Sequence, residues 1–166
     1  MRFFIESGFD IRGVEINKEM IQLGKENLTR LGYEVPETRE GNNLSIPYDD
    51  NFFDMFVCIN TIHYVFGLDI YKALEEYKRV VKDGGVVVVE TPAEKHFAKE
   101  SATRCDEFSW KWEAEGFRKG QTFGFFDSKD HFRQTLKKHF SEVEIHRRTE
   151  ETELTSLDFY IGVCKV

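Results

Sequence analysis

The sequence has few cysteines, few prolines and a deficit of basic residues, and these shortages exclude several classes of protein. Three cysteines without a Cys-x-x-Cys pair predict neither a disulfide framework nor a zinc site, and they favour a reducing, cytoplasmic environment. No apolar run approaches the ~18 residues of a membrane-spanning helix, and an acid comes too early for a signal peptide. The net charge of −7, from 23 basic and 30 acidic residues, argues against nucleic acid as a partner.

The 166 residues are enough for one folded domain with a sizeable core. Unbroken apolar runs, Met-Phe-Val-Cys-Ile within residues 53–59 and four valines at residues 86–89, are typical of parallel strands covered by helices on both faces. A helix ended by Gly8 and a short strand at residues 9–16 precede them, and Asn17 is a good N-cap for the next helix. That helix has an apolar stripe, formed by Met20, Leu23, Leu28 and Leu31, and it ends at Gly32.

The rest of the chain predicts further helices and an antiparallel end. An apolar helical face lies at residues 70–81, a weak strand lies near Pro36, and a last helix covers residues 128–140. Residues 142–148 and 157–165 alternate in polarity, so we expect a hairpin joined by a polar loop. The predicted fold is α/β: a single domain over residues 1–166, with a Rossmann-like, doubly wound, mostly parallel sheet and a C-terminal antiparallel hairpin.

Residues 91–127 break this pattern with many aromatic side chains among charges. Substrate lids commonly lie at the carboxyl edge of such a sheet, so we interpret this insertion as a lid with few regular backbone hydrogen bonds. The residues expected to line the substrate site are Tyr64, Trp110, Trp112 and Phe123. The alternative is that the aromatic side chains only seal an edge of the core.

Three sequence blocks carry the chemistry. Glu15 follows the strand at residues 9–16, where an acid commonly binds ribose hydroxyls, although an exposed Glu before a helix is also structurally ordinary. Residues 41–54 read Gly-Asn-Asn-Leu-Ser-Ile-Pro-Tyr-Asp-Asp-Asn-Phe-Phe-Asp. Together with Arg-Gly-Val-Glu-Ile-Asn at residues 12–17 and Lys-Arg-Val-Val-Lys-Asp-Gly-Gly at residues 78–85, this segment resembles the class I S-adenosylmethionine-dependent methyltransferases, particularly their type 11 branch.

The resemblance implies an enzyme that moves the methyl group of S-adenosylmethionine to an oxygen or nitrogen atom of a small metabolite. Glu15 would bind the ribose hydroxyls, and Asn42 stands where the family has an Asp facing the adenine amino group, which implies a weaker contact. The other cofactor contacts implied by the resemblance are Ile16, Asn43, Leu44 and Asn60. His63 matches a His near the transferred methyl group and would act as a general base; the alternative is a His packed on the lid. No metal is implied.

The sequence departs from the family at its start, because the fourteen residues before Glu15 contain no first strand followed by a glycine-rich loop. The family strand order 3-2-1-4-5-7-6 would then lack strand one, as in an N-terminally truncated domain. We expect a second copy of the chain, another partner, a shifted strand or upstream residues to fill that gap. Weak binding of S-adenosylmethionine follows, with micromolar binding expected in a form extended upstream.

Two other functions fit parts of the sequence. A non-catalytic methyltransferase-like module that acts through a partner or by self-association would explain the missing loop. A nicotinamide-dependent oxidoreductase would share the acid Glu15, but it would not explain the block at residues 41–54 or the terminal hairpin.

Overall fold

The computed structural model describes residues 1–151 and 156–166, and the chain forms two compact units, Met1–Pro47 and Tyr48–Val166. The polar loop predicted between the last two strands falls largely on residues 152–155, which lie outside the described residues. One methyltransferase-like domain over residues 1–166, with a lid at 91–127, stays a prediction.

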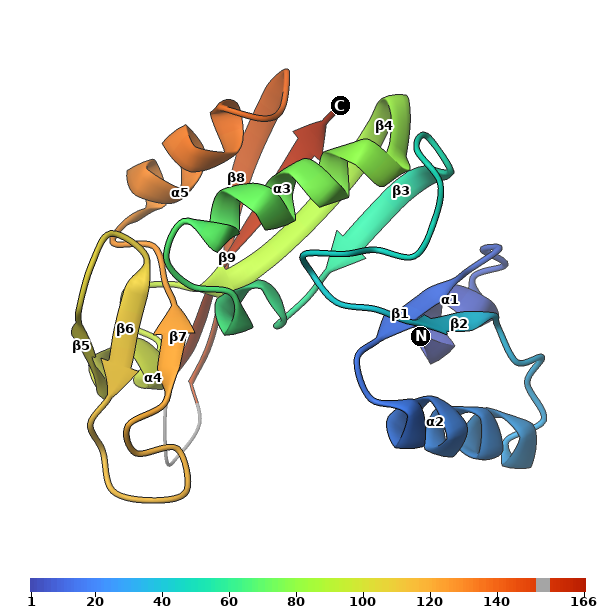
Figure 1. Ribbon diagram of the computed structural model, residues 1–166, viewed down its shortest axis with the longest axis horizontal. Coiled ribbons are helices and arrows are strands. Elements are labelled where there is room, and N and C mark those ends of the chain that lie inside the picture. Colours follow the sequence, from blue (N-terminus) through green and yellow to red (C-terminus); the bar gives the residue numbers. More distant parts are fainter. Residues whose placement is uncertain (152–155) are drawn as a thin grey trace. The chain divides into compact units, whose positions relative to one another are not determined.

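The first unit is a short βαβ motif. Its elements are α1 (Arg2–Glu6), β1 (Gly13–Glu15), α2 (Lys18–Arg30) and β2 (Thr38–Glu40). β1 and β2 pair in parallel, with Glu15 opposite Glu40, and α2 is the crossover between them (Figure 1). Gly8 has a φ of +79° just after α1, which confirms its predicted role at the helix end. The Asn17 side chain accepts hydrogen bonds from the backbone N–H groups of Glu19 and Met20, which confirms the predicted N-cap.

The apolar stripe of α2 is not buried within its unit. Met20, Leu23 and Leu31 are about half exposed, and α2 has no buried residue. The physical reason lies in the sheet of this unit, whose two strands have only three residues each and offer little surface to cover a helix of 13 residues. The strand predicted at residues 9–16 is correspondingly shorter than its apolar pattern suggests.

The second unit is built on a four-stranded sheet with the order β3-β4-β9-β8. β3 (Phe53–Cys58) pairs in parallel with β4 (Val81–Pro92), and β9 (Ser156–Lys165) pairs antiparallel with both β4 and β8 (Glu142–Glu151). The parallel apolar strands and the terminal hairpin are therefore confirmed. With the family's numbering of strands, the observed orders are 3-2 in the first unit and 4-5-7-6 in the second.

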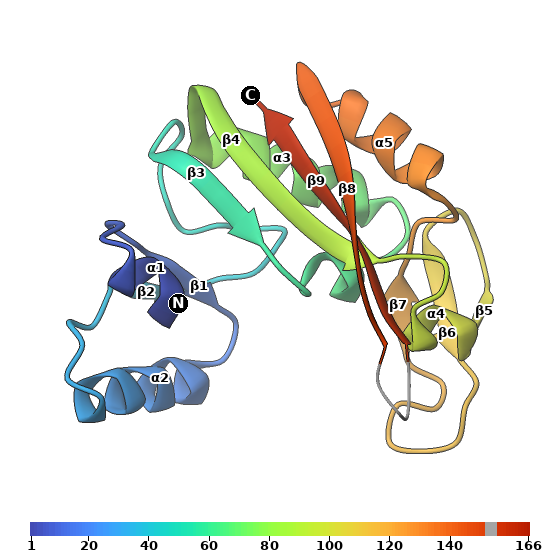
Figure 2. The ribbon, with the colours of Figure 1, turned by 180° about the vertical axis from the view of Figure 1, so that it is seen from behind.

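Helices lie on one face of this sheet. α3 (Asp69–Val80) and α5 (Lys129–Lys137) both lie on the side seen in Figure 1, and Figure 2 shows the strands from behind. Val87 and Val89 are fully buried, whereas Val86 and Val88 are only partly buried. Among the described residues of this unit, the two long helices therefore pack on the same side of the sheet.

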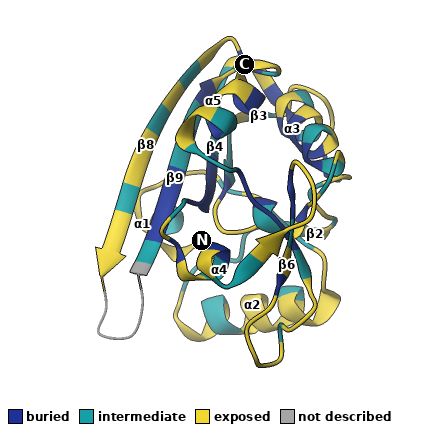
Figure 3. Ribbon diagram, turned by 90° about the vertical axis from the view of Figure 1, so that its left-hand side faces the viewer, coloured by how far each residue is buried: buried dark blue, intermediate teal, exposed yellow. Residues whose placement is uncertain are grey.

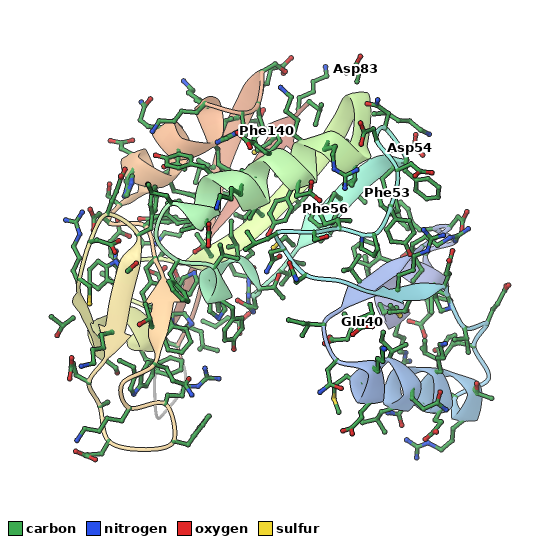
Figure 4. The ribbon with its side chains drawn as sticks, viewed as in Figure 1. Glu40, Phe53, Asp54, Phe56, Asp83 and Phe140 are labelled. Atoms are coloured by element: carbon green, nitrogen blue, oxygen red, sulfur yellow. The ribbon has the colours of Figure 1, made fainter. Side chains whose placement is uncertain are left out.

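Aromatic packing joins the sheet to its helices. Phe56 of β3 stacks on Tyr77 of α3 with ring centroids 4.7 Å apart (Figure 4). The predicted stripe of the last helix is confirmed, because Phe132, Leu136 and Phe140 are all buried. The last two strands differ in burial, as Figure 3 shows: β9 is largely buried, whereas β8 alternates between exposed and partly buried residues.

The segment at residues 91–127 is more regular than predicted. It contains α4 (Phe97–Glu100) and a three-stranded antiparallel sheet of β5 (Ala102–Arg104), β6 (Ser109–Trp112) and β7 (Thr122–Gly124). The expectation of few regular backbone hydrogen bonds is therefore wrong. Aromatic residues on neighbouring strands pack across this ladder, as where Trp110 pairs with Phe123, and such pairs stabilise a small sheet.

Candidate active site

The second unit has a cavity of about 340 Å³ at the carboxyl ends of β3 and β4. Asn60 follows β3, Pro92 ends β4, and His63 comes from the short 3-10 helix η1 (Ile62–Tyr64). The lining residues are Asn60, His63, Tyr64, Pro92, His96, Phe97, Ala98, Trp112, Arg118, Phe123, Phe125, Leu157 and Phe159. A largely apolar cavity of this size with a few polar groups is typical of a small-molecule site.

Among the titratable residues that line the cavity, His63 is the candidate for a role in catalysis. Its ring lies among the rings of Tyr64, Phe123 and Phe125, at centroid distances of 4.4, 6.2 and 6.4 Å. Burial, together with the positive charges of His96 and Arg118, lowers the pKa of His63 from 6.5 to about 4. Its Nδ1 atom is buried and has no hydrogen-bond partner among the described residues. His63 is therefore a neutral imidazole at pH 7, and its ring lines the cavity.

The turn after β3 fixes the position of these groups. Asn60 has a φ of +54°, a left-handed conformation that Asn tolerates better than most residues. The Cys58 thiol hydrogen-bonds with the hydroxyls of Thr61 and Tyr77, which ties the turn to α3. This local strain lies beside the cavity, as is common at functional sites.

The predicted substrate-site aromatic residues divide into two groups. Tyr64, Trp112 and Phe123 line the cavity. Trp110 lies outside that lining: its ring faces the Lys99 Nζ at 5.1 Å, and its buried Nε1 has no hydrogen-bond partner among the described residues. Because Trp110 also packs against the buried cluster of Trp112, Phe123 and Phe125, it supports the cavity wall from behind.

Sequence reasoning missed two cationic or titratable residues in this cavity. Arg118 lies in the connection between β6 and β7, where only the basic pair Arg118-Lys119 next to Phe117 marks it. His96 follows β4; its Nδ1 accepts a hydrogen bond from the Ala98 backbone, and burial lowers its pKa. The position of Arg118 depends on the sheet of β5, β6 and β7, which the sequence did not predict.

In the first unit, the predicted cofactor residues lie at the ends of the two parallel strands. The Glu15 backbone carbonyl accepts a hydrogen bond from Gly41 N–H at 3.1 Å, and one Glu15 carboxylate oxygen accepts from Asn17 N–H at 2.9 Å. Ile16 and Leu44 expose their apolar side chains beside this edge. The structure therefore brings Glu15 and the turn after β2 together.

That turn is closed by Asn42. The backbones of Asn42 and Ser45 exchange two hydrogen bonds of 3.2 Å, and the Asn42 side-chain oxygen accepts from Leu44 N–H at 2.8 Å. Asn43 is the middle residue of the turn and is partly buried. With its oxygen already engaged, the exposed Asn42 side chain presents its amide N–H groups to a ligand more readily than an acceptor.

Two kinds of site are not found among the described residues. No group of three or more His, Cys, Asp or Glu side chains there could hold a metal ion. No helix in the described ranges is long and apolar enough to cross a membrane.

Comparison with known proteins identifies the family. The model of the family described as "Methyltransferase domain" matches residues 1–89. Demethylmenaquinone methyltransferases of Bacillus cytotoxicus and Bacillus subtilis are 36% and 35% identical over 83 residues. These matches cover 48% of this chain but only 32% and 33% of the relatives, so the matched segment spans about a third of their length.

Solved structures resemble the chain over nearly its whole length. A SAM-dependent methyltransferase from Methanosarcina mazei has a TM-score of 0.76 at 16% identity, with 99% of this chain and 86% of that one covered. A SAM-dependent methyltransferase from Thermotoga maritima, described as a possible histamine N-methyltransferase, has a TM-score of 0.67 at 20% identity, with 99% and 76% covered. These similarities show a common fold.

Proposed function

Because the chain belongs to the class I S-adenosylmethionine-dependent methyltransferases, we propose that it transfers a methyl group to an oxygen or nitrogen atom of a small metabolite. The metabolite would bind in the cavity of the second unit. The observation that carries this assignment is the neutral His63 that lines an aromatic cavity at the carboxyl ends of β3 and β4.

The residues of the first unit fit the cofactor. The Glu15 carboxylate lies at the end of β1 with one oxygen held by Asn17 N–H, so it is oriented and can accept hydrogen bonds from ribose hydroxyls. Leu44 and Ile16 offer exposed apolar surface to the adenine ring, and Asn42 offers its amide. When bound, S-adenosylmethionine would supply an electrophilic methyl group.

The acceptor would be oriented chiefly by His63. A methyl transfer by direct displacement needs alignment of the acceptor atom more than it needs a strong base. A histidine with a pKa of about 4 is a weak base, but it accepts a hydrogen bond at any pH near neutrality. We therefore assign His63 the role of receiving the acceptor O–H or N–H, while Tyr64, Trp112 and Phe123 hold the acceptor between aromatic rings.

A second function is supported by the position of β3. This apolar strand is an edge of its sheet, and an exposed edge is a template for pairing with another chain. A non-catalytic module that acts through a partner or by self-association would use that edge. Such a module would not need the neutral His63 or the carboxylate of Glu15.

Titration calorimetry with S-adenosylhomocysteine at millimolar concentration distinguishes the two functions. We expect saturable binding that weakens about tenfold in Glu15→Gln, because one hydrogen bond to a charged group is lost. Glu19→Gln is the matched control, because Glu19 is an exposed acid in the first turn of α2. The absence of binding, together with self-association in sedimentation, would support the non-catalytic module.

A further inference from the structure

The cavity of the second unit differs in charge from the chain as a whole. The chain has 30 acidic and 23 basic residues, yet the described lining contains Arg118, His63 and His96 and no carboxylate. The other described lining residues are apolar or neutral. Because burial lowers the pKa of both histidines, the positive charge of the described lining at neutral pH is that of Arg118, within a mainly aromatic enclosure.

Arg118 also differs from most of the other arginines, which form ion pairs with carboxylates. Arg79, Arg147 and Arg148 each form ion pairs with carboxylates at 2.7–3.2 Å, but no carboxylate of the described residues lies within ion-pair distance of Arg118. Its contacts are with neutral groups. The guanidinium lies 5.1 Å from the Phe117 ring and 5.5 Å from the Phe123 ring, and Nη2 is 3.5 Å from the Tyr64 hydroxyl.

The backbone around Arg118 is well defined. Gln121 N–H donates to the Arg118 carbonyl at 2.9 Å, and Gly120 N–H donates to the Trp112 carbonyl at 2.9 Å. Gly116 and Gly120 have φ values of +131° and +80°, which allow the tight turn that returns the chain to β7. Arg118 is therefore placed at the cavity by the sheet of β5, β6 and β7.

We propose that the methyl acceptor carries a carboxylate next to an aromatic or apolar ring, and that Arg118 binds this carboxylate and so determines specificity. This inference rests on the proposed function, because it names the class of its acceptor. The planar guanidinium can donate two parallel hydrogen bonds to a carboxylate, and aromatic walls that exclude water strengthen the pair. A single arginine suits one negative charge better than the double charge of a phosphate.

Binding of matched acids and amides tests the proposal. The probes are 4-hydroxybenzoate, salicylate and indole-3-acetate, each paired with its primary amide, with dissociation constants measured by ligand-observed NMR in the presence of S-adenosylhomocysteine. We expect at least one acid to bind about tenfold more tightly than its amide, the effect of one charge-assisted hydrogen-bonded pair. Arg118→Gln should abolish that preference, and Arg118→Lys should keep part of it.

Lys111→Gln is the matched control, because Lys111 is an exposed cation on β6 outside the cavity lining. It should leave the preference for acids unchanged. Equal binding of acids and amides, no binding of any acid, or an unchanged preference in Arg118→Gln overturns the proposal. A failure of the proposed function gives a different result: S-adenosylhomocysteine does not bind in the separate titration.

Discussion

Replacing His63 with glutamine should make the stability of the second unit less sensitive to acid. In the folded chain, burial and the charges of His96 and Arg118 lower the pKa of His63 from 6.5 to about 4. As the pH falls below 6.5, the unfolded chain takes up a proton at this position that the folded chain does not. The folded state is therefore destabilised as the pH falls from 6.5 towards 4, and this loss should be absent in His63→Gln.

The magnitude follows from the two pKa values. Between about pH 7.5 and about pH 5, the linkage relation gives a loss of about 2 kcal/mol from His63 alone. His96 changes stability in the same direction, because burial lowers its pKa while Asp158 opposes the shift. Wild type should therefore still lose about 2 kcal/mol more than His63→Gln over this range.

Urea unfolding at the two pH values measures this difference. His146→Gln is the control, because the His146 side chain is exposed on β8, and it should lose as much stability as wild type. An equal loss in wild type and His63→Gln would refute the reasoning, since it would mean that the folded chain protonates His63 as readily as the unfolded chain does.

Three further substitutions should change the free energy of unfolding, each by an amount that follows from the contacts of the residue replaced. Asp158→Asn should destabilise the second unit by about 3 kcal/mol in urea unfolding, because the fully buried Asp158 holds Arg147 by two hydrogen bonds of 2.7 Å. Gly124→Ala should destabilise it by more than about 3 kcal/mol and reduce ligand binding, because a Cβ there would lie 1.8 Å from the Val65 carbonyl oxygen. Gly24→Ala should instead increase helix content by circular dichroism and stabilise α2 by about 0.5–1 kcal/mol, because a Cβ there meets nothing within 4 Å.

The strands of the main sheet could be predicted because their signal is local. The runs at residues 55–59 and 86–89 are apolar without interruption, and they lie in the parallel pair β3 and β4. The helix cap at Asn17 depends on a side chain that reaches its own neighbours, so it too was readable from sequence. The order of the strands came from the resemblance to the family rather than from these patterns.

The sheet of β5, β6 and β7 could not be predicted because it depends on pairing between strands that are themselves too short to give a clear sequence pattern. Its strands have three or four residues, which is too short for a clear alternation, and its ladder pairs residues such as Ala102 with Trp112. The same limit explains Trp110. It shares an aromatic pattern with Trp112, but only the packing of the sheet decides which ring faces the cavity.

The positive charge at the cavity could not be predicted from the sequence either, because it depends on which residues folding brings together. A net charge of −7 is a sum over the whole chain and does not indicate which charges meet at one site. Folding places Arg118 and His63 together, and the pKa of His63, lowered mainly by burial, is lowered further by His96 and Arg118. A carboxylate bound to Arg118 would offset part of that repulsion, so acceptor binding and the proton affinity of His63 are thermodynamically coupled. The residue that selects an acidic acceptor would thereby also make His63 a better proton acceptor when that acceptor is bound.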